Sequence, residues 1–181
     1  MKIALSKLIV QVLVVFGVLG TSSQYSDEYS LKAAWLGKFT HFIEWPVSEQ
    51  NKVQFFSIGV YKTNPFGNIL ENLYDDYQIW GKPVKIKYIN SIDSVKTVNM
   101  LFVPKSAMKN FGKLVTETRK IPVLLICEAK GSAETGAHIN FYFINDKIRF
   151  EINESAMRDS GFFVSFRLLN IAQIIKPESD Q

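Results

Sequence analysis

The sequence is poor in cysteine and histidine, and this shortage limits what the protein can be. Cys127 is the single cysteine among 181 residues, and the two histidines are His41 and His138. One thiol cannot close an internal disulfide, and no cysteine–histidine set has the spacing of a structural metal site. Because Cys127 ends the apolar run 122–126, we expect a buried and unreactive thiol.

Familiar catalytic motifs are also missing. No serine lies in a G-x-S-x-G turn, and residues 131–136 lack the Lys-Ser/Thr that completes a phosphate-binding loop. Cys127 has no paired base, and His41 with Glu44 indicates a solvated pair rather than a metal contact. The sequence therefore predicts no catalytic residues, no metal and no cofactor, and the protein is not expected to be an enzyme.

Charge and composition describe an ordinary globular chain. Apolar residues make up 47% and charged residues 21%, which excludes disorder, collagen and coiled coil. The net charge is +4, and it falls by two to +2 once Lys2 and Lys7 leave with the leader described next. This surplus is too small and too scattered to predict nucleic-acid binding.

The first 24 residues have the three parts of a secretory signal. Two lysines precede an apolar core, Leu8–Leu19, and small polar residues follow it. The core is well short of the ~20 residues that a membrane-spanning helix needs. We therefore expect residues 1–24 to be a cleaved signal peptide and residues 25–181 to be exported and not inserted in the membrane.

Residues 25–181 are expected to form one domain. Apolar residues at helical spacing predict a first helix, Asp27–Glu44, whose polar side includes Lys32. Short apolar runs separated by helical stretches predict a parallel sheet. Two strands with alternating polar and apolar residues follow this sheet. A last apolar stripe predicts a C-terminal helix from about Leu168 to Ile175. The expected strands are 53–61, 84–89, 98–103, 121–126, 138–144 and 147–152. The predicted fold is an α/β, three-layer domain: a mostly parallel central sheet flanked by helices, with a C-terminal antiparallel β-hairpin and a final helix. Residues 128–136 are expected to be a mobile loop.

One group of polar residues is a candidate site. If Asn145-Asp146 is a two-residue turn, strand alternation places four polar side chains on one face of the hairpin. Asn153 ends the second strand and is expected to cap the next helix. Such a group suits either a buried hydrogen-bonded network, with Arg149 and Glu151 paired, or a site for a small polar ligand or a partner, and both readings stay open. The candidate binding residues are Asn140, Tyr142, Arg149, Glu151 and Asn153.

Several segments, in order, resemble the YfiR family of small exported bacterial regulators. They are KAAWLGKF (32–39), FIEWP (42–46), NPFG (64–67), GAHINF (136–141), RFEIN (149–153) and SFRLL (165–169). The resemblance implies a periplasmic α/β domain that acts by binding protein, holding down an inner-membrane diguanylate cyclase and so limiting cyclic-di-GMP and biofilm formation. The chain departs from the family at Ala137 and Phe166, where the family usually has glycine and serine. Paired cysteines that tune some members are absent, so disulfide-based regulation is not expected here.

The expected function follows from this resemblance. The partner is an inner-membrane signalling protein, a diguanylate cyclase or a sensor kinase, contacted through its periplasmic region by apolar patches on the first or the last helix. The alternative is a periplasmic small-ligand sensor domain that feeds a sensor kinase, with loop 128–136 as its lid. The sequence leaves a homodimer open.

Overall fold

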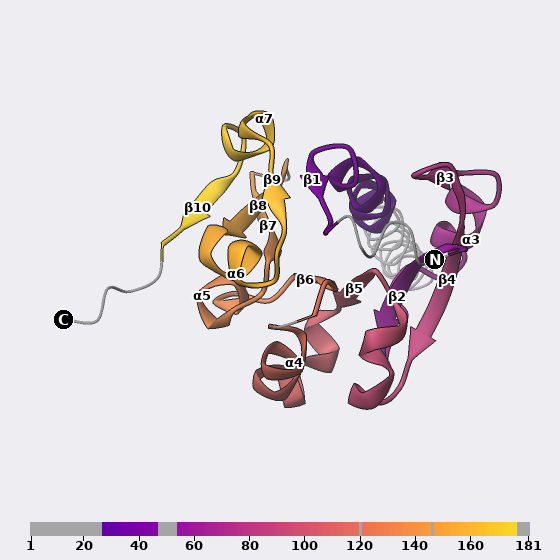
Figure 1. Ribbon diagram of the computed structural model, residues 1–181, viewed down its shortest axis with the longest axis horizontal. Helices are drawn as coiled ribbons and strands as arrows, with labels where there is room; N and C mark the ends of the chain where they lie inside the picture. Colours follow the sequence, from indigo (N-terminus) through magenta and orange to yellow (C-terminus); the bar gives the residue numbers. More distant parts are fainter. Residues whose placement is uncertain (1–26, 47–53, 120, 146, 177–181) are drawn as a thin grey trace, which may run out of the picture.

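The computed structural model describes residues 27–46, 54–119, 121–145 and 147–176 (Figure 1). The predicted signal peptide lies outside these residues. Within the described ranges, no helix combines the length and the hydropathy needed to cross a bilayer.

The centre of the fold is an eight-stranded, mostly parallel sheet, as predicted. Its strand order is β10-β8-β7-β6-β5-β2-β4-β3, with β4, β2, β5, β6 and β7 parallel and the β7–β8 hairpin antiparallel. The strands are β2 (Phe56–Tyr61), β3 (Gln78–Ile79), β4 (Lys82–Ile89), β5 (Met100–Val103), β6 (Leu124–Cys127), β7 (Ile139–Ile144), β8 (Lys147–Asn153) and β10 (Gln173–Ile175). Every residue of β2, β5 and β6 is buried, which explains why these strands are continuous apolar runs.

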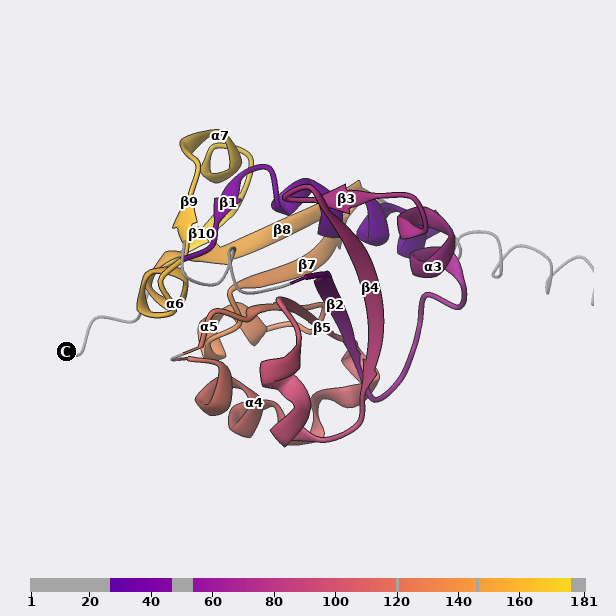
Figure 2. The ribbon, with the colours of Figure 1, turned by 45° about the vertical axis from the view of Figure 1, so that its right-hand side comes forward.

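Helices cover both faces of this sheet (Figures 1 and 2). A helix of residues 27–39 packs on one face through Ala33, Leu36 and Phe39. The opposite face is covered by two 3₁₀ helices and one α-helix, η1 (Ile92–Thr97), η2 (Lys105–Asn110) and α4 (Phe111–Thr118). The shorter helices are α3 (Ile69–Tyr74), α5 (Ser132–Thr135), α6 (Glu154–Asp159) and α7 (Phe166–Leu169). The three-layer α/β prediction is therefore confirmed.

The first helix is shorter than predicted. It ends at residue 39, and the chain then forms a small antiparallel pair between β1 (Ile43–Glu44) and β9 (Phe163–Val164). Ile43 and Trp45 are buried in the same core as Phe39, so the apolar spacing continues although the helix does not.

The predicted C-terminal helix is wrong. A single helical turn, α7, is followed by strand β10, which pairs in parallel with residues 151–153 of β8. β8 would otherwise have an open edge, and β10 supplies hydrogen bonds that a helix could not give to that edge.

The segment 128–136 is also not the open loop that was expected. It contains the helical turn α5, in which Ser132 and Ala133 are buried. Gly136 ends this turn with φ of 123°, and a Cβ there would lie 2.6 Å from the Val115 side chain. Glycine is therefore required at residue 136, and the segment is built into the fold rather than free to act as a lid.

Candidate functional site

The β7–β8 hairpin has the register that the sequence predicts. Asn140 lies opposite Glu151, Tyr142 opposite Arg149 and Ile144 opposite Lys147. The apolar face of the hairpin packs on the first helix, where the Phe150 ring is 4.9 Å from the Trp35 ring. The polar face predicted for this hairpin is therefore directed away from that helix.

Asn140 and Glu151 interact across the two strands. The Asn140 amide donates from Nδ2 to Glu151 Oε2 at 2.8 Å. Asn140 is almost fully buried, and its Oδ1 has no hydrogen-bond partner among the described residues. Burial raises the pKa of Glu151, partly offset by the hydrogen bond from Asn140. This pair therefore has an acceptor atom that the fold itself does not satisfy.

Arg149 does not pair with Glu151, contrary to the structural reading of the sequence. Its guanidinium is exposed and makes one long contact, 3.4 Å from Nη1 to the Ile148 carbonyl. Glu151 is turned toward Asn140 instead, and Tyr142 donates its hydroxyl proton to Gln173 Oε1 at 3.1 Å. Arg149 and Glu151 share a face by strand alternation, but the hydrogen bond from Asn140 holds the Glu151 carboxylate away from the Arg149 guanidinium.

Asn153 lies apart from the other four candidates. Its Oδ1 accepts from the Ala156 N–H at 2.9 Å and so caps α6, as predicted. Its Nδ2 donates to the Ala133 carbonyl at 2.8 Å and ties α5 to the end of β8. These contacts give Asn153 a structural role.

A hollow of about 610 Å³ brings three of the candidates together. Asn140, Tyr142 and Glu151 line it, beside Lys105 and Glu128, which lie within two residues of the ends of β5 and β6. The carboxyl ends of parallel strands are the usual place for ligand sites in open α/β sheets. The hollow is thus the candidate small-ligand site of the fold.

The sequence analysis missed a buried charged cluster at the same edge of the sheet. Glu128 accepts hydrogen bonds from the Tyr29 hydroxyl at 2.9 Å, the Lys105 backbone N–H at 3.0 Å and the Lys32 ammonium. Lys32 also pairs with Glu28, and its side chain is only 3% exposed, so its placement on the polar side of the first helix was wrong. The four-residue spacing of Glu28 and Lys32 signals their ion pair, but no sequence signal reveals Glu128.

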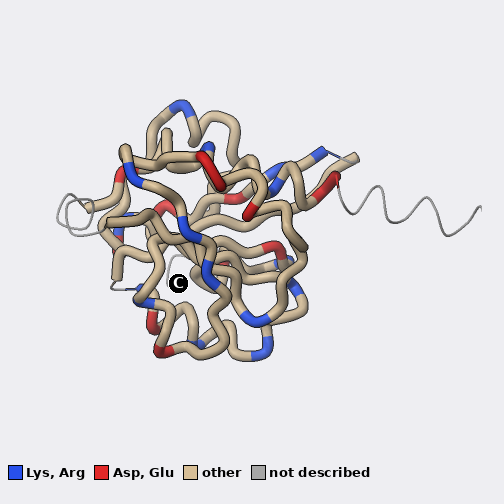
Figure 3. The backbone as a smooth tube through the Cα atoms, turned by 90° about the vertical axis from the view of Figure 1, so that its right-hand side faces the viewer, with Lys and Arg blue, Asp and Glu red and all other residues tan. Residues whose placement is uncertain are grey.

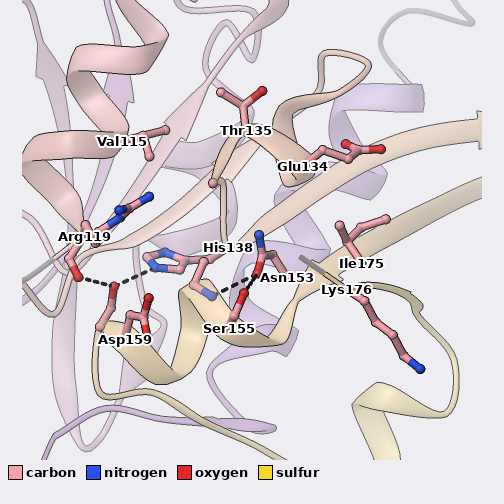
Figure 4. A pocket seen from close by; sticks show the side chains of 13 residues that line it. Val115, Arg119, Glu134, Thr135, His138, Asn153, Ser155, Asp159, Ile175 and Lys176 are labelled. Atoms are coloured by element: carbon pink, nitrogen blue, oxygen red, sulfur yellow. Dashed lines mark hydrogen bonds between the residues drawn. The ribbon is translucent and has the colours of Figure 1, made fainter. Parts of the chain in front are cut away.

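A second hollow, of about 330 Å³, contains His138 (Figure 4). The ring is fully buried: Nδ1 accepts from the Leu125 N–H at 2.8 Å, and Nε2 lies 2.9 Å from Ser160 Oγ. Because Nδ1 accepts, Nε2 must carry the proton and donate it to Ser160, whose hydroxyl then donates to the Arg119 carbonyl at 3.0 Å. Burial lowers the pKa of His138 to about 4.

This His138–Ser160 contact resembles a nucleophile–base pair only in distance. A general base needs an unprotonated nitrogen facing the serine hydroxyl, whereas here the facing nitrogen is the donor. The chain of hydrogen bonds is complete without a substrate. We interpret His138 as a neutral structural residue that joins β6, β7 and the end of α6.

Exposed apolar side chains gather near α7. Phe163 is 72% exposed, Phe166 74% and Ile171 57%. We call these three residues the α7 surface. Large apolar side chains held in water commonly mark a protein-contact site.

Comparison with known proteins identifies a family and partial likenesses to solved structures. The model of the YfiR/HmsC-like family, DUF4154, matches residues 29–173. Among the solved structures, the chain is similar to the ABC domain in complex with L-Trp from Streptococcus pneumonia, with 14% identity, a TM-score of 0.48 and 66% of this chain covered. It is also similar to a conserved domain protein from Vibrio cholerae, with 13% identity, a TM-score of 0.49 and 70% covered. The chain spans 56% of the length of each of these structures. No curated protein matches the sequence.

Proposed function

The chain belongs to the YfiR/HmsC-like family, and we propose from this membership that it is a periplasmic regulator that restrains an inner-membrane diguanylate cyclase by direct protein contact. The family match carries the proposal, because it extends over residues 29–173 and so includes almost the whole described fold. The buried polar groups of that fold are largely satisfied by one another, which suits a binding role better than catalysis.

The α7 surface is the contact we assign to the partner. Phe163 and Phe166 expose most of their rings, and burying such rings against a partner is favourable by the hydrophobic effect. Aromatic side chains at the centre of an interface often dominate its binding energy. The family usually has serine at the position of Phe166. We therefore infer that the Phe166 ring contributes to the specificity of this chain for its own partner.

The mechanism is a shift of population. The regulator binds the inactive state of the cyclase's periplasmic region more tightly than the active state, so the equilibrium moves toward the inactive state without chemistry. A signal that lowers the affinity of the regulator for the inactive state would release the cyclase.

Deletion and complementation in the bacterium that encodes the protein test this function. We expect deletion to raise cellular cyclic-di-GMP, and the wild-type protein to restore the low level. Phe166→Ser should fail to restore it, whereas Leu73→Ser should succeed. Leu73 is the matched control, because it is an exposed leucine on α3, at the other end of the molecule from α7 (Figure 1). Unchanged cyclic-di-GMP after deletion would refute control of a cyclase, and full rescue by Phe166→Ser would refute the α7 surface.

Export is a separate part of the proposal. The mature chain should begin between Thr21 and Tyr25 and be released with the periplasmic contents. Mass spectrometry of the N-terminus checks this, and an intact Met1 on membrane-bound protein would contradict it.

One observation favours a second function, that of a small-ligand sensor. Among the described residues, Asn140 Oδ1 has no hydrogen-bond partner, and it is buried beside Glu151 in the hollow at the carboxyl ends of the strands. A ligand with an N–H group could satisfy both acceptors. Native mass spectrometry of the protein from periplasmic extract should then show a bound small molecule that Asn140→Ala loses; an unliganded wild-type mass would count against this function.

A further inference from the structure

Three lysines surround a hollow at the amino ends of the parallel strands, on the edge of the sheet opposite the candidate ligand site. The hollow has a volume of about 590 Å³ and is lined by residues that precede β2, β5 and β6 and by the neighbouring strand β4. Lys85, Lys87 and Lys96 lie in its wall, and no Asp or Glu does. The charged groups of this hollow are therefore all of one sign.

The fold holds two of these ammonium groups in place. Lys85 and Lys87 are two residues apart on β4 and so share a face. The Lys85 ammonium lies 3.4 Å from the centre of the Phe55 ring, and Lys87 donates to the Thr97 carbonyl at 2.8 Å. Neither contact neutralises a positive charge. In the part of the chain that the structure describes, no carboxylate lies within ion-pair distance of any of the three.

Uncharged groups in the hollow also favour an anion. The Ser57 N–H donates to Asn99 Oδ1 at 2.9 Å, which fixes the orientation of the Asn99 amide. Asn99 lines the hollow, and the remaining polar atom of its side chain is Nδ2, which can only donate a hydrogen bond. Donors thus supplement the ammonium groups.

The three lysines make this hollow locally positive in a chain whose net charge is small. Residues 25–181 carry a net charge of only +2. Figure 3 shows a run of Lys and Arg positions across the side of the molecule that carries β4. Three like charges around one hollow repel one another, and a bound anion relieves that repulsion.

We propose that this lysine hollow is a binding site for a phosphate group. A phosphate group carries about −2 as a free anion or monoester and about −1 as a phospholipid diester, and its several acceptor oxygens match ammonium and amide donors that approach from different sides. The volume admits a phosphate with a substituent. The phosphate can belong to a soluble compound or to the headgroup of an anionic phospholipid, since the recognised chemistry is the same.

Matched triple variants of the mature protein test the site. Lys85, Lys87 and Lys96 are changed together to Gln in the site variant, and Lys109, Lys113 and Lys147 in the control variant. The control residues are exposed lysines outside the hollow, so the two variants have equal net charge. The single change Lys96→Gln is the fallback if the site variant does not fold.

Binding is measured with two kinds of phosphate probe, and an acidic peptide is the comparison ligand. Inorganic phosphate and pyrophosphate are titrated by calorimetry at constant ionic strength, and co-sedimentation is measured with phosphatidylcholine vesicles with and without phosphatidylglycerol. We expect the wild type and the control variant to bind alike and the site variant to bind on the order of tenfold more weakly or worse, because it loses charge-assisted hydrogen bonds. Binding of the soluble probes identifies a soluble phosphate compound; binding of phosphatidylglycerol vesicles alone identifies a headgroup; both support the site.

Three results would overturn the proposal. Equal weakening in the site and control variants would mean general attraction by surface charge and an adventitious ion only. Failure of the wild type to bind either probe would remove the phosphate site. Binding of an acidic peptide by the wild type in place of both phosphate probes would assign the lysines to a protein partner instead.

Discussion

His138 should make the stability of this protein fall as the pH drops from about 6.5 to about 4. Its pKa is near 6.5 in the unfolded chain, whereas burial lowers the pKa to about 4 in the fold. Between these values the unfolded state binds a proton that the native state does not. Stability therefore rises with pH across this window and is complete above it. Each pKa unit corresponds to about 1.4 kcal/mol, so the free energy of unfolding should lose about 3 kcal/mol.

The structure explains why the native ring resists protonation. Nδ1 faces the Leu125 N–H, so a proton there would oppose another proton. Nε2 already donates to Ser160. Arg119 and Asp159 line the same hollow, but neither is in an ion pair with the ring. Protonation thus requires the hydrogen bonds that join β6 to α6 to break.

Denaturant unfolding of three proteins between pH 7.5 and pH 4.5 measures the effect. His138→Gln should be less stable at pH 7.5 by about 1–3 kcal/mol, since it loses hydrogen bonds to buried groups. Its stability should change less with pH than that of the wild type. His41→Gln should follow the wild type, because the His41 ring is exposed. A wild-type curve no steeper than that of His138→Gln, or a titration of His138 near pH 6.5 by NMR, would refute the reasoning.

Three further predictions concern single side chains. Glu128→Gln should lower the free energy of unfolding by about 1–3 kcal/mol, because the buried Lys32 loses its ion pair with the buried Glu128 and keeps the one with the partly exposed Glu28; Lys113→Gln, on the exposed side of α4, is the control, and equal melting temperatures of the two variants would contradict the cluster. Dithiothreitol should leave the melting temperature of the monomer unchanged, since Cys127 is buried and unpaired, and a drop would indicate a disulfide between chains. Glu151→Gln should stabilise the protein slightly at pH 7, by less than about 1 kcal/mol, because the raised pKa means that the charged form is disfavoured in the fold. That gain should vanish in acid, where Glu151 is protonated, and a clear loss of stability at pH 7 would show that the carboxylate itself is needed.

The parts of the fold that depend on local signals were predictable from the sequence. Asn145 adopts a positive φ of 49° in the hairpin turn, and the alternation on either side set the register from Asn140 to Glu151. Asn153 caps α6 because a capping side chain acts within three residues of its own position. In each case the information lies within a short stretch of chain.

The candidate site was predictable only in part, because it depends on contacts between distant residues. Lys32 and Glu128 are 96 residues apart, and their ion pair requires the first helix to lie over the ends of β5 and β6. The sequence shows that Arg149 and Glu151 share a face, but not that Asn140 takes the carboxylate. Strand alternation predicts the face of the sheet on which a side chain lies, whereas the packing of the whole sheet determines its hydrogen-bond partner.

The wrong prediction of a C-terminal helix bears directly on function. A helix from Leu168 to Ile175 would have turned Leu168, Ile171 and Ile175 to one side, against the core. Because the chain instead turns after α7 to add β10 to the sheet, Leu168 is buried while Ile171 is left 57% exposed near Phe166. The strand that closes the edge of β8 therefore also produces the α7 surface. Changes that weaken β10 should thus impair partner binding as well as stability, which links the edge of the sheet to regulation.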